Sequence, residues 1–165
     1  MTILPKKTLQ ELLIKCWMTH DGMWFYHCLQ ECGIDTANKL NKAAIKSLAP
    51  LEIDRVRKAY QLGPVENFAD VKKLIDSAFE VLKGDFMQFR YSFPSENVMR
   101  WEMDQCFAYE GMKRFGVADT YQCGVLYRVC CWIEHAGVRF TVNPPVEGCL
   151  MHINGKCEGE IRFSL

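Results

Sequence analysis

The spacing of apolar residues changes near residue 85, and this change constrains the fold more than any other feature of the chain. Before it, apolar side chains recur every three to four residues, as in amphipathic helices. After it, apolar and polar residues alternate over 87–93 and again over 99–103, as in strands with one buried face. The sequence therefore predicts an α+β protein. A helical part (1–84) and a mixed antiparallel sheet-and-helix part (85–165) should pack together as one body.

Several helices are expected in the first part. Thr8 and Glu11 have the spacing of a capping box, which predicts that the first helix begins there. Asn67 can cap the last helix of this part, which Gly84 should end. Because glycine and proline interrupt helices, breaks are expected between these ends at three places: His-Asp-Gly (20–22), Gly33 and Pro50.

Four strands and two helices are expected in the second part. The helix over 119–136 is apolar on nearly all sides, which predicts that it is buried. The segment between Cys149 and Cys157 has Asn154-Gly155 at its centre and suggests a hairpin. The other expected elements are a helix over 104–115 and strands over 87–93, 99–103, 138–142 and 156–164.

Charge and composition argue against several classes of partner. The chain has 20 acidic and 20 basic residues and no basic stripe, so neither nucleic acid nor an anionic membrane surface is indicated. No apolar run approaches the roughly 20 residues of a membrane span, and the first residues are too polar for a secretion signal. We therefore expect a cytoplasmic protein whose nine cysteines are reduced.

Four of these cysteines are candidate metal ligands. Cys123, Cys149 and Cys157 have the spacing Cys-x25-Cys-x7-Cys, and Cys106 lies 17 positions before Cys123. Thiolates from distant segments can hold one soft cation if the fold gathers them. Zinc is the first expectation and an iron–sulfur cluster the second, because the short Cys-x2-Cys pairs of clusters are missing. The alternative is that these cysteines only fill apolar space.

The type of turn between Cys149 and Cys157 distinguishes a metal site from cysteines that only fill apolar space. A two-residue turn at Asn154-Gly155 would direct Cys149 and Cys157 to opposite faces of a hairpin. A loop with an odd number of residues, or a knuckle, would bring the two sulfurs together. A second metal site at Cys28 and Cys32 is disfavoured, because thiols four residues apart also occur on any apolar helix face.

The spacing Cys123-x25-Cys149-x7-Cys157, followed by an apolar strand, resembles the zinc site of the 4-vinyl-reductase domain. That domain occurs in the sensor region of some phenol-responsive transcriptional activators. The resemblance covers about residues 85–165 and implies a structural zinc beside an apolar pocket for a small ligand. In that family a glutamate just before the second cysteine is the fourth ligand. Here Glu147 stands two residues before Cys149, which leaves Glu147 and Cys106 as candidates.

Two further resemblances concern the whole chain. It resembles a group of small cytosolic, cysteine-rich proteins of anaerobic bacteria and archaea through a His-Asp-Gly-x-Trp element at 20–24. More distantly it is similar to aminothiazoline-carboxylate hydrolase-like proteins, through the strand from Cys157 to Phe163. Neither resemblance implies an assigned activity.

Aromatic residues of the second part are candidates for the wall of a ligand pocket. Trp101 falls close to the position of the pocket tryptophan in the sensor family. Tyr91, Phe107 and Tyr127 are expected to join it.

The sequence therefore predicts a zinc-stabilised, sensor-like module that binds an apolar or aromatic small molecule. It should act through a second copy of itself or another protein. The alternative is a small metal- or thiol-dependent hydrolase acting on a C–N or C–S bond, in which His20 or His152 assists a thiol. A catalytic metal keeps an open coordination position, whereas four protein ligands close it. A pure protein–protein scaffold would have neither metal nor pocket.

Overall fold

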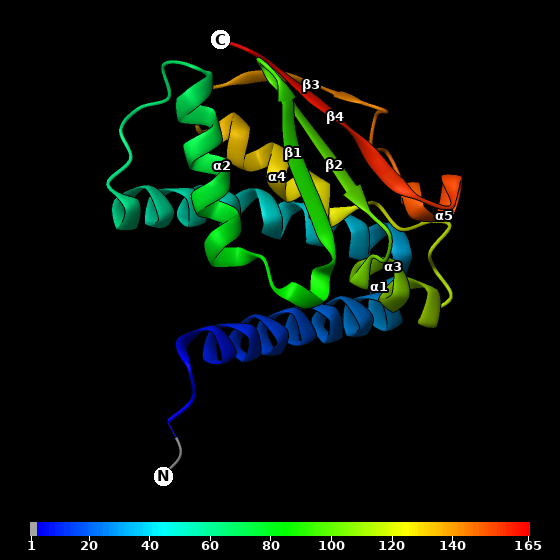
Figure 1. Ribbon diagram of the computed structural model, residues 1–165. Coiled ribbons are helices and arrows are strands. Elements are labelled where there is room, and N and C mark those ends of the chain that lie inside the picture. The colour runs from blue at the N-terminus through cyan, green and yellow to red at the C-terminus, as the bar shows by residue number, and fades with distance from the viewer. Residues whose placement is uncertain (1–2) are drawn as a thin grey trace.

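A four-stranded antiparallel sheet and five α-helices make up the computed structural model, which describes residues 3–165 (Figure 1). The predicted mixture of helices with an antiparallel sheet is confirmed. The strand order is β1 (Phe89–Ser95), β2 (Val98–Met103), β4 (Cys157–Ser164) and β3 (Arg139–Asn143).

The central strands bury one face of the sheet. Met99, Trp101 and Met103 alternate along β2 with the exposed residues Arg100 and Glu102, as the period of two predicts. The indole ring of Trp101 lies across its β4 partner Gly159, where a Cβ would come within 2.4 Å of the ring. The ring therefore depends on glycine at this position.

The longest helix, α1 (Lys6–Tyr60), is interrupted once. Gly33 has the left-handed backbone angles φ 75° and ψ 169°, and the chain reverses direction there (Figure 1). The break predicted at Gly33 is confirmed, whereas those at 20–22 and Pro50 are wrong. Both sites remain helical, and around Pro50 the fully buried Ala49 and Ile53 hold the backbone against the core. Tertiary packing outweighs the local preference of proline there.

The shorter helices follow the predicted pattern in part. In α2 (Phe68–Leu82), the Asn67 side chain accepts a hydrogen bond from the Asp70 amide at 3.2 Å, so the predicted cap is confirmed. The predicted hairpin is wrong, because Leu150 and Met151 are buried within a short helix that Gly155 ends. The remaining helices are the 3-10 turn η1 (Asp85–Met87), α3 (Phe107–Arg114), α4 (Gly124–His135) and α5 (Leu150–Asn154).

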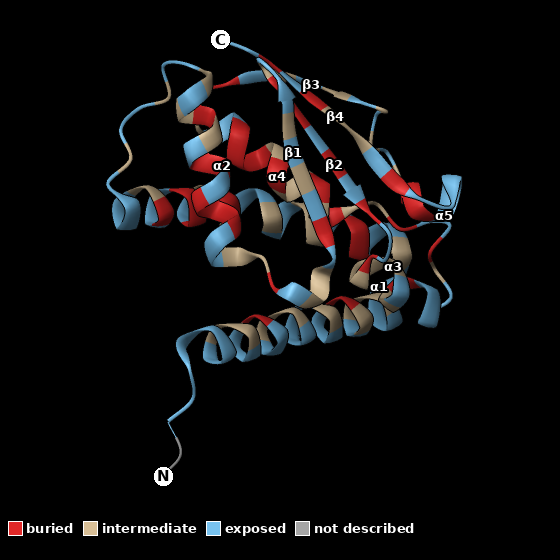
Figure 2. Cartoon of the chain, viewed as in Figure 1, coloured by how far each residue is buried: buried red, intermediate tan, exposed pale blue. Residues whose placement is uncertain are grey.

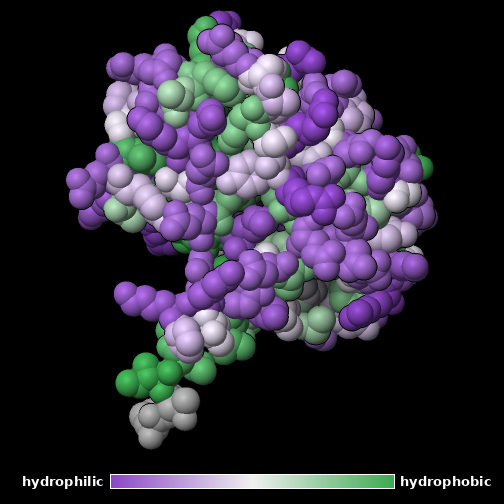
Figure 3. Space-filling model, viewed as in Figure 1, coloured by the Kyte–Doolittle hydropathy of each residue, from purple (hydrophilic) through white to green (hydrophobic). Residues whose placement is uncertain are grey.

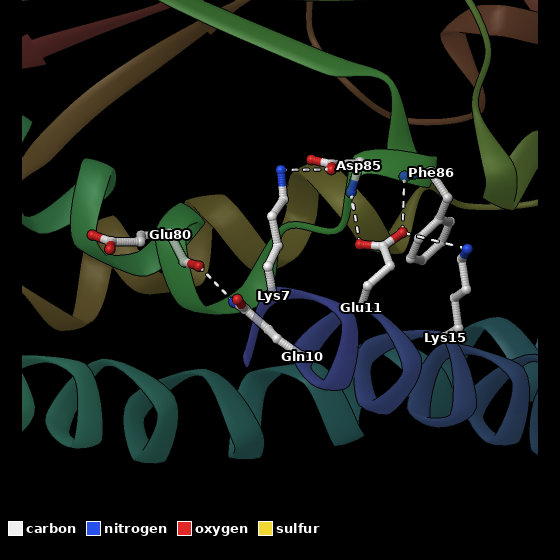
Figure 4. A network of polar contacts seen from close by, with 7 residues as sticks. All are labelled: Lys7, Gln10, Glu11, Lys15, Glu80, Asp85 and Phe86. Carbon is white, nitrogen blue, oxygen red and sulfur yellow. Dashed lines mark hydrogen bonds and ion pairs between the residues drawn. The ribbon is translucent and has the colours of Figure 1, made fainter. Parts of the chain in front are cut away.

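The first half of α1, residues 6–32, is held at its N-terminal end by polar contacts (Figure 4). Glu11 accepts hydrogen bonds from the amides of Asp85 at 3.0 Å and Phe86 at 3.4 Å. Gln10 donates to the carbonyl oxygen of Glu80 at 2.7 Å, at the end of α2. The predicted capping box is therefore wrong: the N-cap of α1 is Pro5, three residues before Thr8, and Glu11 caps η1 instead of its own helix.

The same half of α1 is mostly exposed (Figure 2). Ile14 and Phe25 are its only buried residues. Figure 3 shows a mainly hydrophilic face with hydrophobic side chains gathered near the start of α1, where Ile3, Leu9 and Leu13 are exposed. This segment therefore contributes less apolar burial than the second half of α1.

One hydrophobic core joins the helices to the sheet, from Phe25 in α1 to Phe163 in β4. Helix α4 packs on the second half of α1 and contacts α2 through Trp132 and Phe79, whose ring centroids are 5.8 Å apart. Across residues 3–165, no helix has the uninterrupted apolar length that a bilayer span requires.

Candidate functional site

A cavity of about 420 Å³ lies where the first half of α1 meets the sheet and its helices. Its wall comes from both halves of α1, the end of α2, β1, β2, α3 and α4. Most lining side chains are apolar, and five of them are methionines: Met18, Met23, Met87, Met103 and Met112. The volume falls in the range of small-molecule sites, which are mainly apolar with a few polar groups.

Only one of the four predicted ligand-contacting residues lines this cavity. Phe107 does so at the start of α3. Trp101 instead packs over Gly159 inside the sheet. Tyr91 donates a hydrogen bond from its hydroxyl to Asp76 at 2.9 Å, and Tyr127 lies beside the Lys42 ammonium. The contribution of α1 to this cavity was not predicted, because helical periodicity does not reveal which element covers a sheet.

A buried ion pair borders the cavity. Glu52, only 5% exposed, accepts hydrogen bonds from Arg128 Nε at 2.8 Å and from Trp132 Nε1 at 2.9 Å. The Arg128 guanidinium also lies over the ring of Trp17, 4.5 Å from its centroid. Since Trp17 and Glu52 belong to different halves of α1, this network ties both halves to α4. No local pattern in the sequence indicates it, because Glu52 and Arg128 are 76 positions apart.

The four candidate metal ligands gather beside the cavity, where Cys106 and Cys123 immediately precede the lining residues Phe107 and Gly124. Three of them immediately precede a helix: Cys106 before α3, Cys123 before α4 and Cys149 before α5. Cys157 begins β4 and pairs with Met103, three residues before Cys106. The rings of Tyr109 in α3 and His152 in α5 have centroids 6.5 Å apart, so these two helices are neighbours.

The segment that carries Cys123 is fixed to α1 by a buried amide. Asn38, 2% exposed, donates to the Thr120 carbonyl at 2.9 Å and accepts from the Gln122 amide at 3.1 Å. A Cβ on Gly148 would lie 3.9 Å from the Tyr121 carbonyl oxygen, so the residues before Cys149 pass close to the same segment. Neither contact was apparent from the sequence.

Burial sets the chemistry of these thiols. Loss of solvent raises the pKa of Cys123 to about 12 and that of Cys157 to about 11, and it also raises the pKa of Cys106. Each of these pKa values is raised further by neighbouring thiols of the group, which places the four side chains within electrostatic reach of one another. Hydrogen bonds from backbone amides at the starts of α3 and α4 lower the pKa of Cys106 and Cys123 and favour the thiolate form.

Two features bear on the fit of a metal. The Nε1 of the fully buried Trp101 makes no well-formed hydrogen bond, and this N–H group lowers the pKa of the Cys157 thiol. Glu147 is exposed, whereas Cys106 is buried like Cys149 and Cys157. Within residues 3–165, no three His, Cys, Asp or Glu side chains stand at the spacing of ligands around an ion. The fold thus gathers the thiols without closing their side chains around one point.

The histidines considered for catalysis have other neighbours. His20 is exposed and lies 3.5 Å from Asp21, and His152 faces the ring of Tyr109. Both Cys28 and Cys32 lie on α1, where Cys32 is exposed. None of these contacts pairs an imidazole with a thiol, and burial raises the pKa of Cys106, Cys123 and Cys157, which favours the thiol over the nucleophilic thiolate.

Comparison with known proteins gives one family. The model of a family of unknown function, DUF6125, matches residues 4–154. No curated protein matches the chain.

Proposed function

The chain belongs to the family of unknown function DUF6125, and we propose that it is a sensor-like module that binds an apolar or aromatic small molecule. The observation that carries this proposal is the cavity of about 420 Å³ between α1, the sheet and α4. Each 100 Å² of apolar ligand surface buried there would contribute about 2.5 kcal/mol to binding. Methionine side chains adapt to irregular shapes, so the wall can accommodate related ligands.

The first half of α1 gives this site a means of access. It forms one wall of the cavity through Met18 and Phe25, yet buries few side chains. Segments with little apolar burial open at lower free-energy cost than the core. A ligand can therefore enter beneath residues 6–32 while the sheet and α4 keep their packing.

A variant that fills the cavity tests the proposal. Gly22 lines the cavity within α1, and a Cβ at this position meets no atom within 4 Å. We expect Gly22→Phe to fold and to lose most binding of the neutral fluorophore N-phenyl-1-naphthylamine, measured by fluorescence titration. Lys39→Phe, which adds the same ring to an exposed helical site, is the control. If Gly22→Phe and Lys39→Phe bound the fluorophore with equal affinity, the cavity would not be its binding site. If the wild type gave no saturable fluorescence signal, the proposed binding function would be contradicted.

We also propose that Cys106, Cys123, Cys149 and Cys157 hold one structural zinc, with an iron–sulfur cluster as the second choice. Four sulfur donors suit a soft cation and would close its coordination shell, so the metal would stabilise the fold and leave no open position for catalysis. Amides at the starts of α3 and α4, together with the Trp101 N–H, would offset the negative charge of the thiolates.

The resemblance of residues 85–165 to the 4-vinyl-reductase domain supports the same proposal. On this basis the sheet with α3, α4 and α5 is assigned to that type of domain. We place the protein in the cytoplasm and expect its response to pass to a second copy or to another protein.

A further inference from the structure

The outer face of the first half of α1 carries a row of exposed, mainly apolar side chains (Figure 2). Leu9 is 48% exposed, Leu13 62% and Trp24 68%. Successive members of the row are three or four residues apart, so they lie along one face of the helix. We call this row the outer stripe, and its members are Leu9, Leu12, Leu13, Cys16, His20 and Trp24.

The inner face of the same segment already has its partners. Ile14 and Phe25 are buried in the protein, and Trp17 lies beside the Arg128 guanidinium. No residue of the outer stripe lines the cavity. A surface helix of a single chain is normally polar on the face away from the core, and a contiguous exposed apolar patch marks an interaction site. We therefore expect another surface to cover the outer stripe.

The charged residues at the two ends of the outer stripe have opposite signs. Lys6 lies three positions before Leu9 and Glu31 seven positions after Trp24, so both continue the same helix face. Both are exposed, and neither forms an ion pair with any residue in 3–165. Two antiparallel copies of this helix would place Lys6 of each beside Glu31 of the other. A parallel pair would bring like charges together instead.

The size of this face also fits a second copy of the chain. The outer stripe with Lys6 and Glu31 comprises eight exposed side chains; at roughly 100 Å² each they would bury roughly 800 Å² per copy, about the area that a stable interface buries on each partner. A two-fold dimer requires a surface that is complementary to itself, which this face is in the antiparallel orientation. A membrane surface fits less well, because interfacial helices carry many Lys and Arg side chains on the face opposite the apolar one.

We propose that two copies of the chain pair through the outer stripe, with their α1 segments antiparallel and Lys6 of each copy beside Glu31 of the other. In this register Leu13 of one copy lies opposite Trp24 of the other, seven residues further inward on each helix. Large aromatic side chains near the centre of an interface contribute much of its stability, so Trp24 is the expected anchor. The pairing does not depend on the proposed ligand site, because the outer stripe lies outside the cavity wall.

Sedimentation equilibrium tests whether the outer stripe is the interface. We expect the wild type to be a dimer and Leu13→Lys to be a monomer, because the variant would bury an unpaired charge at two symmetric positions. Leu51→Lys is the matched control, since Leu51 is a 54% exposed leucine in the second half of α1. It should remain dimeric, and circular dichroism should show that both variants are folded.

Charge reversal tests the antiparallel arrangement. Lys6→Glu and Glu31→Lys should each weaken the dimer at least about fivefold at low ionic strength, because each places like charges together at two positions. The double variant Lys6→Glu/Glu31→Lys should restore the wild-type affinity. Single variants that dimerise as the wild type does would overturn the antiparallel pairing. A dimer that persists in Leu13→Lys would overturn the interface, and a monomeric wild type, including one that binds phosphatidylcholine vesicles, would overturn the proposal as a whole.

Discussion

Replacing Glu52 with alanine is expected to lower the free energy of unfolding by about 3–5 kcal/mol, because the substitution leaves Arg128 without its buried counter-ion. The loss also removes the acceptor of the Trp132 indole N–H. Small domains are stable by roughly 5–15 kcal/mol in total, so this change removes a large share of the stability. Urea unfolding followed by circular dichroism measures it.

Asp54→Ala provides the matched control on the same helix. Asp54 is exposed and pairs with His135 at 3.0 Å, so its removal should cost less than about 1 kcal/mol. If Glu52→Ala were no more destabilising than Asp54→Ala, the buried ion pair would not hold α1 to α4 as described.

Cys149→Ser and Cys157→Ser are each expected to abolish zinc binding and to lower the melting temperature. Metal affinity is linked to folding, so loss of a structural ion removes stability from the native state. Elemental analysis of protein prepared without an affinity tag should give about one zinc per chain in the wild type and none in the variants. A chelator should reduce the melting temperature of the wild type towards that of the variants.

Cys16→Ser and Cys32→Ser are the controls, since both thiols are exposed on α1. They should retain the metal and the melting temperature. Iron and sulfide in place of zinc would support the cluster as the second choice. A wild type that contains neither metal and melts at the same temperature with and without chelator would contradict the metal proposal.

The features that were predicted correctly from the sequence are determined by residues close together in the chain. The change of period near residue 85 predicted the strands, Asn67 predicted the start of α2, and Gly33 predicted the break in α1. The breaks expected at 20–22 and at Pro50 were wrong. At Pro50, contacts of α1 with the core stabilise a helical backbone, and local propensity does not include them.

The sites depend on contacts between distant segments, and the sequence predicted them less well. Cysteine spacing identified four thiols that the fold gathers, although a helix, α5, replaces the expected hairpin between Cys149 and Cys157. The cavity requires the first half of α1 to lie against the sheet, and its ion pair joins residues 76 positions apart. A single sequence contains no periodic signal for either arrangement.

Photolabelling with a small neutral aryl diazirine tests the central claim, that the cavity binds apolar molecules, most directly. Labelled peptides identified by mass spectrometry should come from the α1, α3 and α4 segments that line the cavity, and Gly22→Phe should suppress this labelling. Label confined to exposed apolar side chains such as Leu9 and Leu13, and unchanged in Gly22→Phe, would contradict the claim.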